Sequence, residues 1–380
     1  MGWTWGLKHK PTLNVFLFVL LPLTTVCIYV LLSSETWLYS QSQQKEIIDP
    51  NRTAIVNAIV NVIAVDLSTT NANNNIHTIP AASIPTRSQL ISTCKDPFLS
   101  EFKRGKIYLC NRVFGGLGNQ MFSYASAYAI AKRNNRIVVT EKSRSLNRVF
   151  SLKAELIDSF CVCDGARNVG PRWSCRFDES FFNKSLTQGV NFGVNTYLQS
   201  WMYFRHAEAD IRRQFTFSDS NRKAAREIIQ KTLSTGGWES ATVIAVHIRR
   251  GDITKDPRFI NHGYRVPTEN YFYKAFDYFR KKVSNPVFLL FSDNFPWTKS
   301  HLNGSDVIYM EGHNATTDMA LMTQCTHTIM SVGTFGWWAA YLAGGTTIYY
   351  RHPARNGSSL RNAFSKDYFD FFMPQWIGME

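Results

Sequence analysis

The sequence predicts an α/β protein in which two Rossmann-like lobes follow an N-terminal transmembrane helix and a polar stem. Three observations lead to this expectation: a long uncharged stretch near the N-terminus, a polar segment interrupted by prolines, and a later series of apolar runs separated by helical stretches. Continuous apolar strands that alternate with helices are typical of parallel sheets covered on both faces. A chain of 380 residues is long enough for two such lobes.

The uncharged stretch Leu13–Leu32 has about the 20-residue length that a helix needs to cross a hydrocarbon core. Lys8 and Lys10 precede it and the next basic residue is Lys45, so residues 1–12 are expected to form a cytoplasmic tail. A cleaved signal peptide is the alternative, but the apolar stretch is unusually long and no A-x-A-like cleavage site follows it. Both interpretations send the rest of the chain into the secretory pathway.

Residues 33–104 are rich in Asn and Thr and are interrupted by Pro80, Pro85 and Pro97. Such a segment has little apolar surface to offset its ordering entropy, so it is expected to be an extended luminal stem. The luminal globular region would then be residues 105–380, with a lobe boundary near Gly236 and Gly237.

Sequons and cysteines both fit an oxidising lumen. Five N-x-[ST] sequons are candidate glycan acceptors: Asn51, Asn183, Asn303, Asn314 and Asn356. Six cysteines beyond the apolar stretch could form up to three disulfides, with pairings that the sequence leaves open: Cys94, Cys110, Cys161, Cys163, Cys175 and Cys325. A zinc site is less favoured, because no matching His or Cys pair stands at finger spacing.

The formal charge of +14 is spread along the chain. Nucleic-acid binders usually concentrate their basic residues, so a nucleic-acid partner is not expected. An anionic lipid surface or a phosphorylated small substrate remains compatible with the charge. The oligomeric state stays open, and a homo-oligomer is one option.

The globular region begins with the apolar run Lys106–Cys110, the glycine turn FGGLGNQ, a helix over Gln120–Arg133 and a strand over Arg136–Thr140. Four further apolar runs predict the strands of the second lobe: Thr242–Ile248, Pro286–Ser292, Asp306–Met310 and His327–Val332.

The segment AVHIRRGD, Ala245–Asp252, joins a buried strand to paired arginines, and ligands of open α/β sheets lie at such strand ends. Strand alternation puts His247 and Arg249 on one face, and Arg250 on the other. A guanidinium suits a diphosphate leaving group, so Arg249 is expected to bind it, whereas Arg250 is expected to pair with Asp252. The competing interpretation is that both arginines form only structural ion pairs.

The glycine turn carries Gly115, Gly116 and Gly118, which would let the backbone approach an anion at a helix N-terminus. Its spacing matches neither a dinucleotide-binding loop nor a P-loop. Asn119 follows the turn, where it would either enter the cleft or cap the helix.

The segment Thr317–Gly345 is expected to form a helix, a buried strand, a tight turn and a second helix. Gly333 and Thr334 begin that last helix, where N–H groups and the hydroxyl would hold a phosphate. Trp337 and Trp338 are expected in the core, with sugar stacking as the alternative.

The chain contains no D-x-D triplet and no H-E-x-x-H motif. No metal site and no cofactor are therefore expected, and arginines with backbone dipoles would meet the charge of a leaving diphosphate. Asp293, at the end of Pro286–Ser292, is a candidate for binding guanine or ribose.

Three ordered motifs, HIRRGD, GGLGNQM and MALMTQCTHTIMSVGTFGWWAAYLAGG, resemble the galactoside α-1,2-fucosyltransferases over about Arg104–Tyr350. The resemblance implies a Golgi type II membrane enzyme with a GT-B-like fold, anchored by one helix. It implies inverting transfer of fucose from GDP-β-L-fucose to the 2-hydroxyl of a terminal β-galactose, without an obligatory metal. By the same resemblance, Arg249 is the pyrophosphate ligand and Asn119 lies near the sugar.

The sequence does not identify the catalytic base, and the carboxylates considered for it are Asp252, Glu269, Glu311 and Asp318. Asp252 is the first choice among them, set against a structural role in the turn. The tryptophan pair in GTFGWW departs from the vertebrate pattern and leaves the acceptor glycan open. Two other functions stay open: a fucosyltransferase of another linkage, either core α-1,6 or peptide-directed, and a non-catalytic luminal glycan-binding protein.

Overall fold

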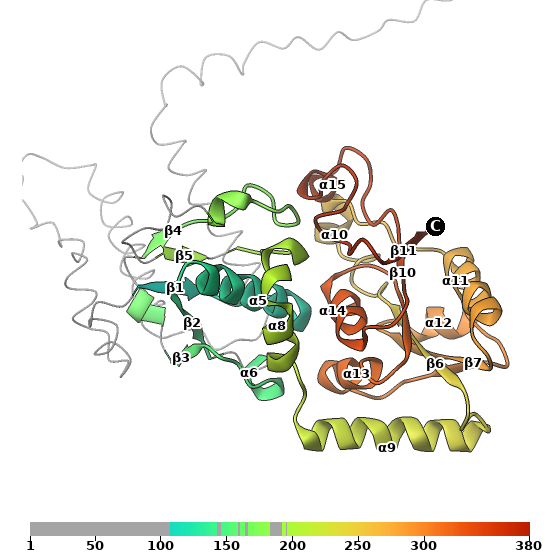
Figure 1. The fold of residues 1–380 in the computed structure, drawn as a ribbon. Helices are drawn as coiled ribbons and strands as arrows, with labels where there is room; N and C mark the ends of the chain where they lie inside the picture. Colours follow the sequence, from blue (N-terminus) through green and yellow to red (C-terminus); the bar gives the residue numbers. More distant parts are fainter. Residues whose placement is uncertain (1–106, 143–145, 159, 164–165, 183–191, 195) are drawn as a thin grey trace, which may run out of the picture. The chain divides into compact units, whose positions relative to one another are not determined.

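A computed structural model describes residues 107–142, 146–158, 160–163, 166–182, 192–194 and 196–380 (Figure 1). The expected tail, transmembrane helix and stem lie outside these residues, as do Cys94 and the sequons Asn51 and Asn183. Within the described ranges, no helix combines the length and the apolar character needed to span a membrane. The described residues all belong to one compact unit.

The first lobe is built on a parallel sheet of order β3-β2-β1-β5-β4. Its strands are β1 (Tyr108–Asn111), β2 (Ile137–Glu141), β3 (Glu155–Ile157), β4 (Arg167–Asn168) and β5 (Phe192–Val194). Its helices are α5 (Leu117–Arg133) and the short α6 (Leu146–Val149). All four residues of β1 are buried, which explains why this strand reads as a continuous apolar run.

The 3₁₀ helices η1 (Phe160–Cys163) and η2 (Glu179–Phe182) lie between strands of the first sheet. The connection from β5 to the second sheet contains the 3₁₀ helices η3 (Trp201–Tyr203) and η4 (Arg205–Ala207), followed by α8 (Glu208–Gln214) and α9 (Asp219–Gly236). Gly237 ends α9 in the left-handed conformation, with φ 72°. The two glycines near which we expected a lobe boundary are therefore a helix terminus, and α9 itself packs against α13 (Ala315–Met322) of the second lobe.

The second lobe carries a six-stranded parallel sheet of order β11-β10-β9-β6-β7-β8. The strands are β6 (Thr242–Ile248), β7 (Pro286–Ser292), β8 (Val307–Tyr309), β9 (His327–Met330), β10 (Thr347–Tyr350) and β11 (Ile377–Met379). Besides α13, the helices are α10 (Pro257–His262), α11 (Glu269–Lys282), α12 (Phe295–His301), α14 (Thr334–Ala343) and α15 (Ser359–Ala363). The predicted α/β class with two parallel sheets is confirmed.

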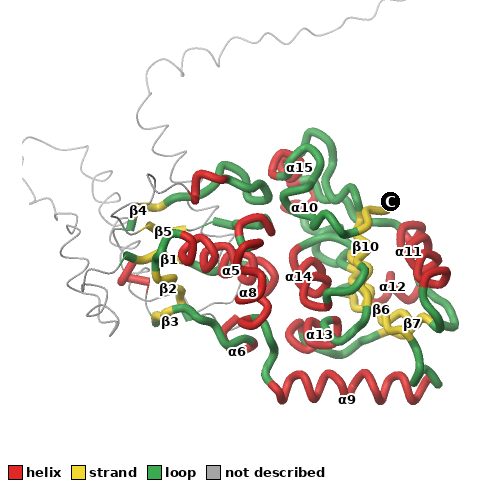
Figure 2. Tube along the Cα trace, in the orientation of Figure 1, coloured by secondary structure: helices red, strands yellow, loops and turns green. Residues whose placement is uncertain are grey.

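Helices α5 and α14 contact each other and join the two lobes (Figures 1 and 2). Trp337 and Trp338 of α14 are fully buried, and both pack against Phe122 of α5 with ring centroids 4.6 and 5.1 Å away. These tryptophans are core residues, as expected, and the alternative that they stack on a sugar is wrong. Burial of aromatic surface between α5 and α14 therefore holds the two lobes together.

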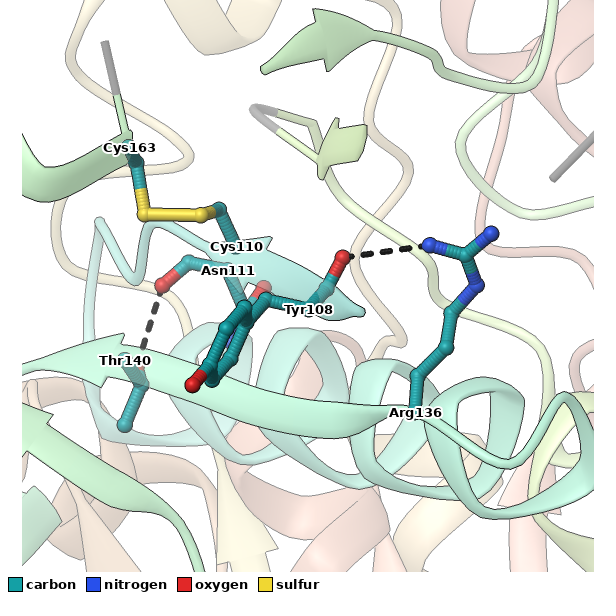
Figure 3. The surroundings of a disulfide bond; sticks show 6 residues. All are labelled: Tyr108, Cys110, Asn111, Arg136, Thr140 and Cys163. Carbon is teal, nitrogen blue, oxygen red and sulfur yellow. Dashed lines mark hydrogen bonds between the residues drawn. A yellow bond between two sulfur atoms is a disulfide. The ribbon is translucent and has the colours of Figure 1, made fainter. Parts of the chain in front are cut away.

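A disulfide joins Cys110 of β1 to Cys163 of η1, with Cα atoms 6.0 Å apart (Figure 3). The same figure shows two hydrogen bonds to backbone carbonyls of β1: Arg136 donates to Tyr108, and the hydroxyl of Thr140 donates to Asn111. Cys161 is also disulfide-bonded, whereas Cys175 and Cys325 are buried free thiols. The six cysteines therefore form at most two disulfides rather than three. Over the residues that the structure describes, no cluster of three metal-binding side chains occurs.

Three of the five sequons lie in the described ranges, and each of their asparagines is exposed: Asn303, Asn314 and Asn356. Asn314 is also the N-cap of α13, where its Oδ1 accepts a hydrogen bond from the backbone N–H of Thr317 at 3.0 Å. Attachment of a glycan to Nδ2 is compatible with this cap, because the cap uses the other end of the amide.

Candidate active site

Two motifs that are far apart in the sequence meet where α5 begins beside the start of α14. A Cβ atom on Gly118 would lie 2.6 Å from the carbonyl carbon of Thr334 and 2.7 Å from the nitrogen of Phe335. The hydroxyl of Thr334 donates to Oδ1 of Asn119 at 2.7 Å. Gly118 is therefore needed for close packing of two backbones, and Asn119 links the lobes instead of capping its own helix.

Asn119 has further partners in the first lobe. Nε2 of Gln199 donates to its Oδ1 at 3.0 Å, and Asn119 also forms a hydrogen bond with the hydroxyl of Tyr197. Gly115 lies beside both groups with φ +76°, in the left-handed region that favours glycine. Gly116 is exposed, and a Cβ atom on it would meet nothing within 4 Å. Gln199 and Tyr197 were not among the site residues predicted from the sequence.

His247 and Arg249 share one face of β6, as the alternation predicts. Nδ1 of His247 lies 3.3 Å from the hydroxyl of Ser331, and the same hydroxyl accepts from the backbone N–H of Arg249 at 2.9 Å. A Cβ atom on Gly336 would lie 2.4 Å from Nδ1, so the first turn of α14 covers the ring. Burial, reinforced by the charge of Arg249, lowers the pKa of His247 to about 3. His247 is therefore neutral at physiological pH, which suits a positioning role rather than proton transfer.

Arg249 pairs with Asp252, so the expectation that Arg250 would make this pair is wrong. Nη2 of Arg249 lies 2.7 Å from Oδ2 of Asp252, and Nε lies 3.3 Å from Oδ1. Asp252 follows Arg249 by three residues, and the turn after β6 places its carboxylate beside the guanidinium of Arg249. Nη1 of Arg249 lies beside Gly333, 3.3 Å from where a Cβ atom would stand. This fixed guanidinium thus faces the start of α14.

Arg250 points to the other side of β6, where its guanidinium lies 3.9 Å from the ring centroid of Trp297 and donates to the carbonyl of Pro267 at 2.8 Å. Oδ1 of Asp293 accepts the backbone N–H groups of Arg250 and Gly251 at 2.8 and 2.9 Å. Asp293 therefore fixes the turn that carries both arginines. The sequence predicted a role for Asp293 in binding guanine or ribose and did not predict this contact with the turn.

The other carboxylates considered as bases have different surroundings. Glu311 pairs with Lys299 at 2.6 Å, and Glu269 is exposed in the first turn of α11. Asp318 lies in the first turn of α13, with its buried Oδ1 3.6 Å from Nδ1 of His313 and without a hydrogen bond. Burial raises the pKa of Asp318 to about 6, although the neighbouring His313 lowers it. Of these carboxylates, only Asp252 touches Arg249.

Asp318 should make the stability of the protein depend on pH. Its pKa is about 6 in the folded protein and about 3.9 in an unfolded chain, so the folded state binds the proton more tightly. The free energy of unfolding should therefore fall as pH rises from about 4 to about 6. Asp318→Asn should be more stable than the wild type at pH 7 by about 1 to 2 kcal/mol, a figure discounted for partial exposure.

Urea unfolding of the Asp318→Asn variant and the wild type at pH 4.5 and pH 7 measures this effect. Asp219, whose side chain is 91% exposed, provides the matched control Asp219→Asn, for which we expect no such change with pH. A stability difference between Asp318→Asn and the wild type that is equal at both pH values contradicts the assignment.

The chain is similar to known proteins in sequence and in structure. The model of glycosyl transferase family 11 matches residues 173–380. The rat galactoside alpha-(1,2)-fucosyltransferase 2 is 33% identical over 275 residues, which cover 70% of this chain and 75% of that protein. The mouse protein of the same name is 34% identical over 284 residues, covering 72% and 78%. Fucosyltransferase NodZ from Bradyrhizobium has a similar structure, with 18% identity, a TM-score of 0.43, and coverage of 62% of this chain and 92% of NodZ.

Proposed function

Because the chain belongs to glycosyl transferase family 11, we propose that it transfers L-fucose from GDP-β-L-fucose to the 2-hydroxyl of a terminal β-galactose, with inversion. The acceptor class is taken from the relatives, which are named galactoside fucosyltransferases. The observation that carries the proposal is the convergence of Arg249, the start of α14 and Asn119 at one place.

Arg249 is suited to stabilise the departing diphosphate. Its charge is permanent, and Asp252 fixes its orientation through Nη2 and Nε. Gly333 and Thr334 begin α14 beside Nη1, so the helix N-terminus adds backbone N–H groups and a positive dipole at the same point. Donors placed where negative charge develops favour the transition state over the bound substrate.

The reaction is a single displacement. The 2-hydroxyl oxygen of galactose forms a bond to the anomeric carbon of fucose, the bond from that carbon to the β-phosphate oxygen breaks, and GDP leaves with the electron pair. Because Arg249 engages both carboxylate oxygens of Asp252, we assign Asp252 to orienting the guanidinium. An oxocarbenium-like path lessens the need for a strong base, and the hydroxyl proton passes to solvent water as the new bond forms.

The proposal includes a Golgi location with the globular region in the lumen. The uncharged stretch 13–32, the basic residues before it, the exposed sequons and the Cys110–Cys163 disulfide all support the secretory pathway. It also includes catalysis without an obligatory metal, since the sequence lacks a D-x-D triplet and provides arginine for the diphosphate.

Transfer assays with the full-length protein in detergent test the proposal. Radiolabelled GDP-fucose or GDP-mannose is supplied with a terminal β-galactoside, with the same sugar capped at its 2-hydroxyl, or with a peptide. We expect transfer of fucose alone, only to the galactoside with a free 2-hydroxyl, and nearly unchanged in EDTA. Transfer to the capped sugar or the peptide indicates another linkage, donor binding without transfer indicates a glycan-binding protein, and loss in EDTA restored by Mn²⁺ contradicts the metal-free mechanism.

A further inference from the structure

A row of polar side chains runs through the first lobe to α14. The thiol of Cys175 donates to Oε1 of Gln199 at 3.3 Å, and Nε2 of Gln199 donates to Oδ1 of Asn119 at 3.0 Å. The same Oδ1 accepts from the hydroxyl of Thr334 at 2.7 Å. Asn119 and Thr334 are 215 residues apart in the sequence, so this row connects segments that no local motif joins.

The chemistry of each group decides which side chain donates and which accepts in this row. Cys175 is 2% exposed, and burial raises the pKa of its thiol to about 12, so the thiol keeps its proton and can donate. Gln199 then presents its carbonyl to the thiol and its amide N–H to Asn119. Asn119 in turn presents Oδ1 to Gln199 and Thr334, which leaves Nδ2 for the hydroxyl of Tyr197.

One end of this row lies at the site already described, because Thr334 begins the helix whose start faces Arg249. Turning the amide of Asn119 over would put N–H groups against the donors of Gln199 and Thr334. The orientation of this one amide therefore controls both the contact with α14 and the hydrogen bond to Tyr197.

We propose that Gln199, oriented by the thiol of Cys175, is a positioning residue that holds the Asn119 amide so that the start of α14 is set for the diphosphate. The inference rests on the proposed function, because it takes the start of α14 as the phosphate site. Gln199 does not touch the reacting atoms and acts through Asn119.

The variant Gln199→Glu tests this with almost no change in shape. A carboxylate has no N–H, so it opposes Oδ1 of Asn119 with a second acceptor, whereas a protonated carboxyl can donate again. At pH 7.5 we expect GDP to bind about 10- to 100-fold more weakly to the variant than to the wild type, with a parallel loss in kcat/KM. At pH 5 the ratio between wild type and variant should shrink several-fold.

Other titratable groups near Gln199 do not explain such a pH effect. Burial keeps the thiol of Cys175 and the hydroxyl of Tyr197 protonated over this range, since it raises the pKa of both groups. Arg249 is paired with Asp252 and is common to both proteins, so its influence cancels in the ratio. Gln324→Glu makes the same chemical change at an exposed position and should leave GDP binding and transfer unchanged.

A second pair of variants covers the case in which Gln199→Glu fails to fold. Cys175→Ser keeps a donor toward Gln199 and should retain most GDP affinity, whereas Cys175→Ala removes the donor and should lose several-fold. Unfolding curves of each variant separate loss of fold from loss of positioning. Equal GDP affinity in Gln199→Glu and the wild type at both pH values overturns the inference, and so does a loss that is the same at pH 7.5 and pH 5.

The outcomes also separate the inference from the proposed function. Wild-type protein that binds GDP but transfers no fucose to a galactoside contradicts the proposed function, while the pH-dependent GDP affinity of Gln199→Glu still tests the inference. Wild-type protein that transfers fucose, together with a Gln199→Glu variant that transfers equally well at pH 7.5, contradicts the inference alone.

Discussion

Replacing Arg249 by alanine should lower kcat for fucose transfer by about 100- to 1,000-fold, the usual effect of removing one donor from a site of developing negative charge. The guanidinium lies beside Gly333 at the start of α14, and Asp252 holds it in place. Removal takes away the fixed positive charge from the departing diphosphate. Initial rates at saturating GDP-fucose, with the unfolding midpoint as a check on folding, measure the effect.

Arg250→Ala is the matched control, because it removes the same group from the next residue. The guanidinium of Arg250 stacks on the ring of Trp297 and donates to the carbonyl of Pro267. Its loss should therefore lower the midpoint of thermal unfolding, and should lower kcat less than the loss of Arg249 does. Transfer by Arg249→Ala at more than a tenth of the wild-type rate, or an equal loss of kcat in both variants, removes the assigned role of Arg249.

Gly118→Ala should have the second large effect, on activity and stability together. The added methyl group would stand 2.6 to 2.7 Å from backbone atoms of Thr334 and Phe335, and backbone cannot move aside as a flexible side chain can. We expect α5 and α14 to separate locally, at a cost of about 3 kcal/mol, the upper part of the range for overpacking. The hydrogen bond between Thr334 and Asn119 would be strained at the same time, so transfer should fall at least tenfold.

Gly116→Ala controls for the loss of a glycine in the same turn. A Cβ atom at this position meets nothing within 4 Å, and φ there is −68°, which alanine adopts readily. Its cost should stay below about 1 kcal/mol, as for an ordinary change at a helix N-cap. Urea unfolding of the two variants side by side measures the difference, and equal stability of both variants argues against close packing at Gly118.

The positions of β6 and β7 were predictable because burial on both faces leaves a direct mark on composition. The bounds of β6 and β7 agree with the predicted runs Thr242–Ile248 and Pro286–Ser292. The period of two also placed His247 and Arg249 on one face correctly. Tryptophans 337 and 338 were expected in the core because an apolar helix beside a buried strand has little exposed surface.

The sequence could not predict contacts that depend on the path of the chain after a strand. Asp252 follows both arginines, and only the geometry of the turn decides that it reaches Arg249. Gln199 and Tyr197 follow the three-residue strand β5, which is too short to read as an apolar run. The sequence signal for these two residues is their position just after a strand of the parallel sheet, because ligands bind at such strand ends. This position can be recognised only when the bounds of β5 are known.

The linkage and anomeric configuration of the product test the central claim most directly. Full-length protein is incubated with GDP-β-L-fucose and a terminal β-galactoside, and the purified product is analysed by NMR spectroscopy. We expect an α-configured fucose on the 2-hydroxyl of galactose, because a single displacement inverts the β-linked donor. A β-linked fucose contradicts the single displacement, and an α-linked fucose on any other hydroxyl contradicts the assignment of the acceptor position.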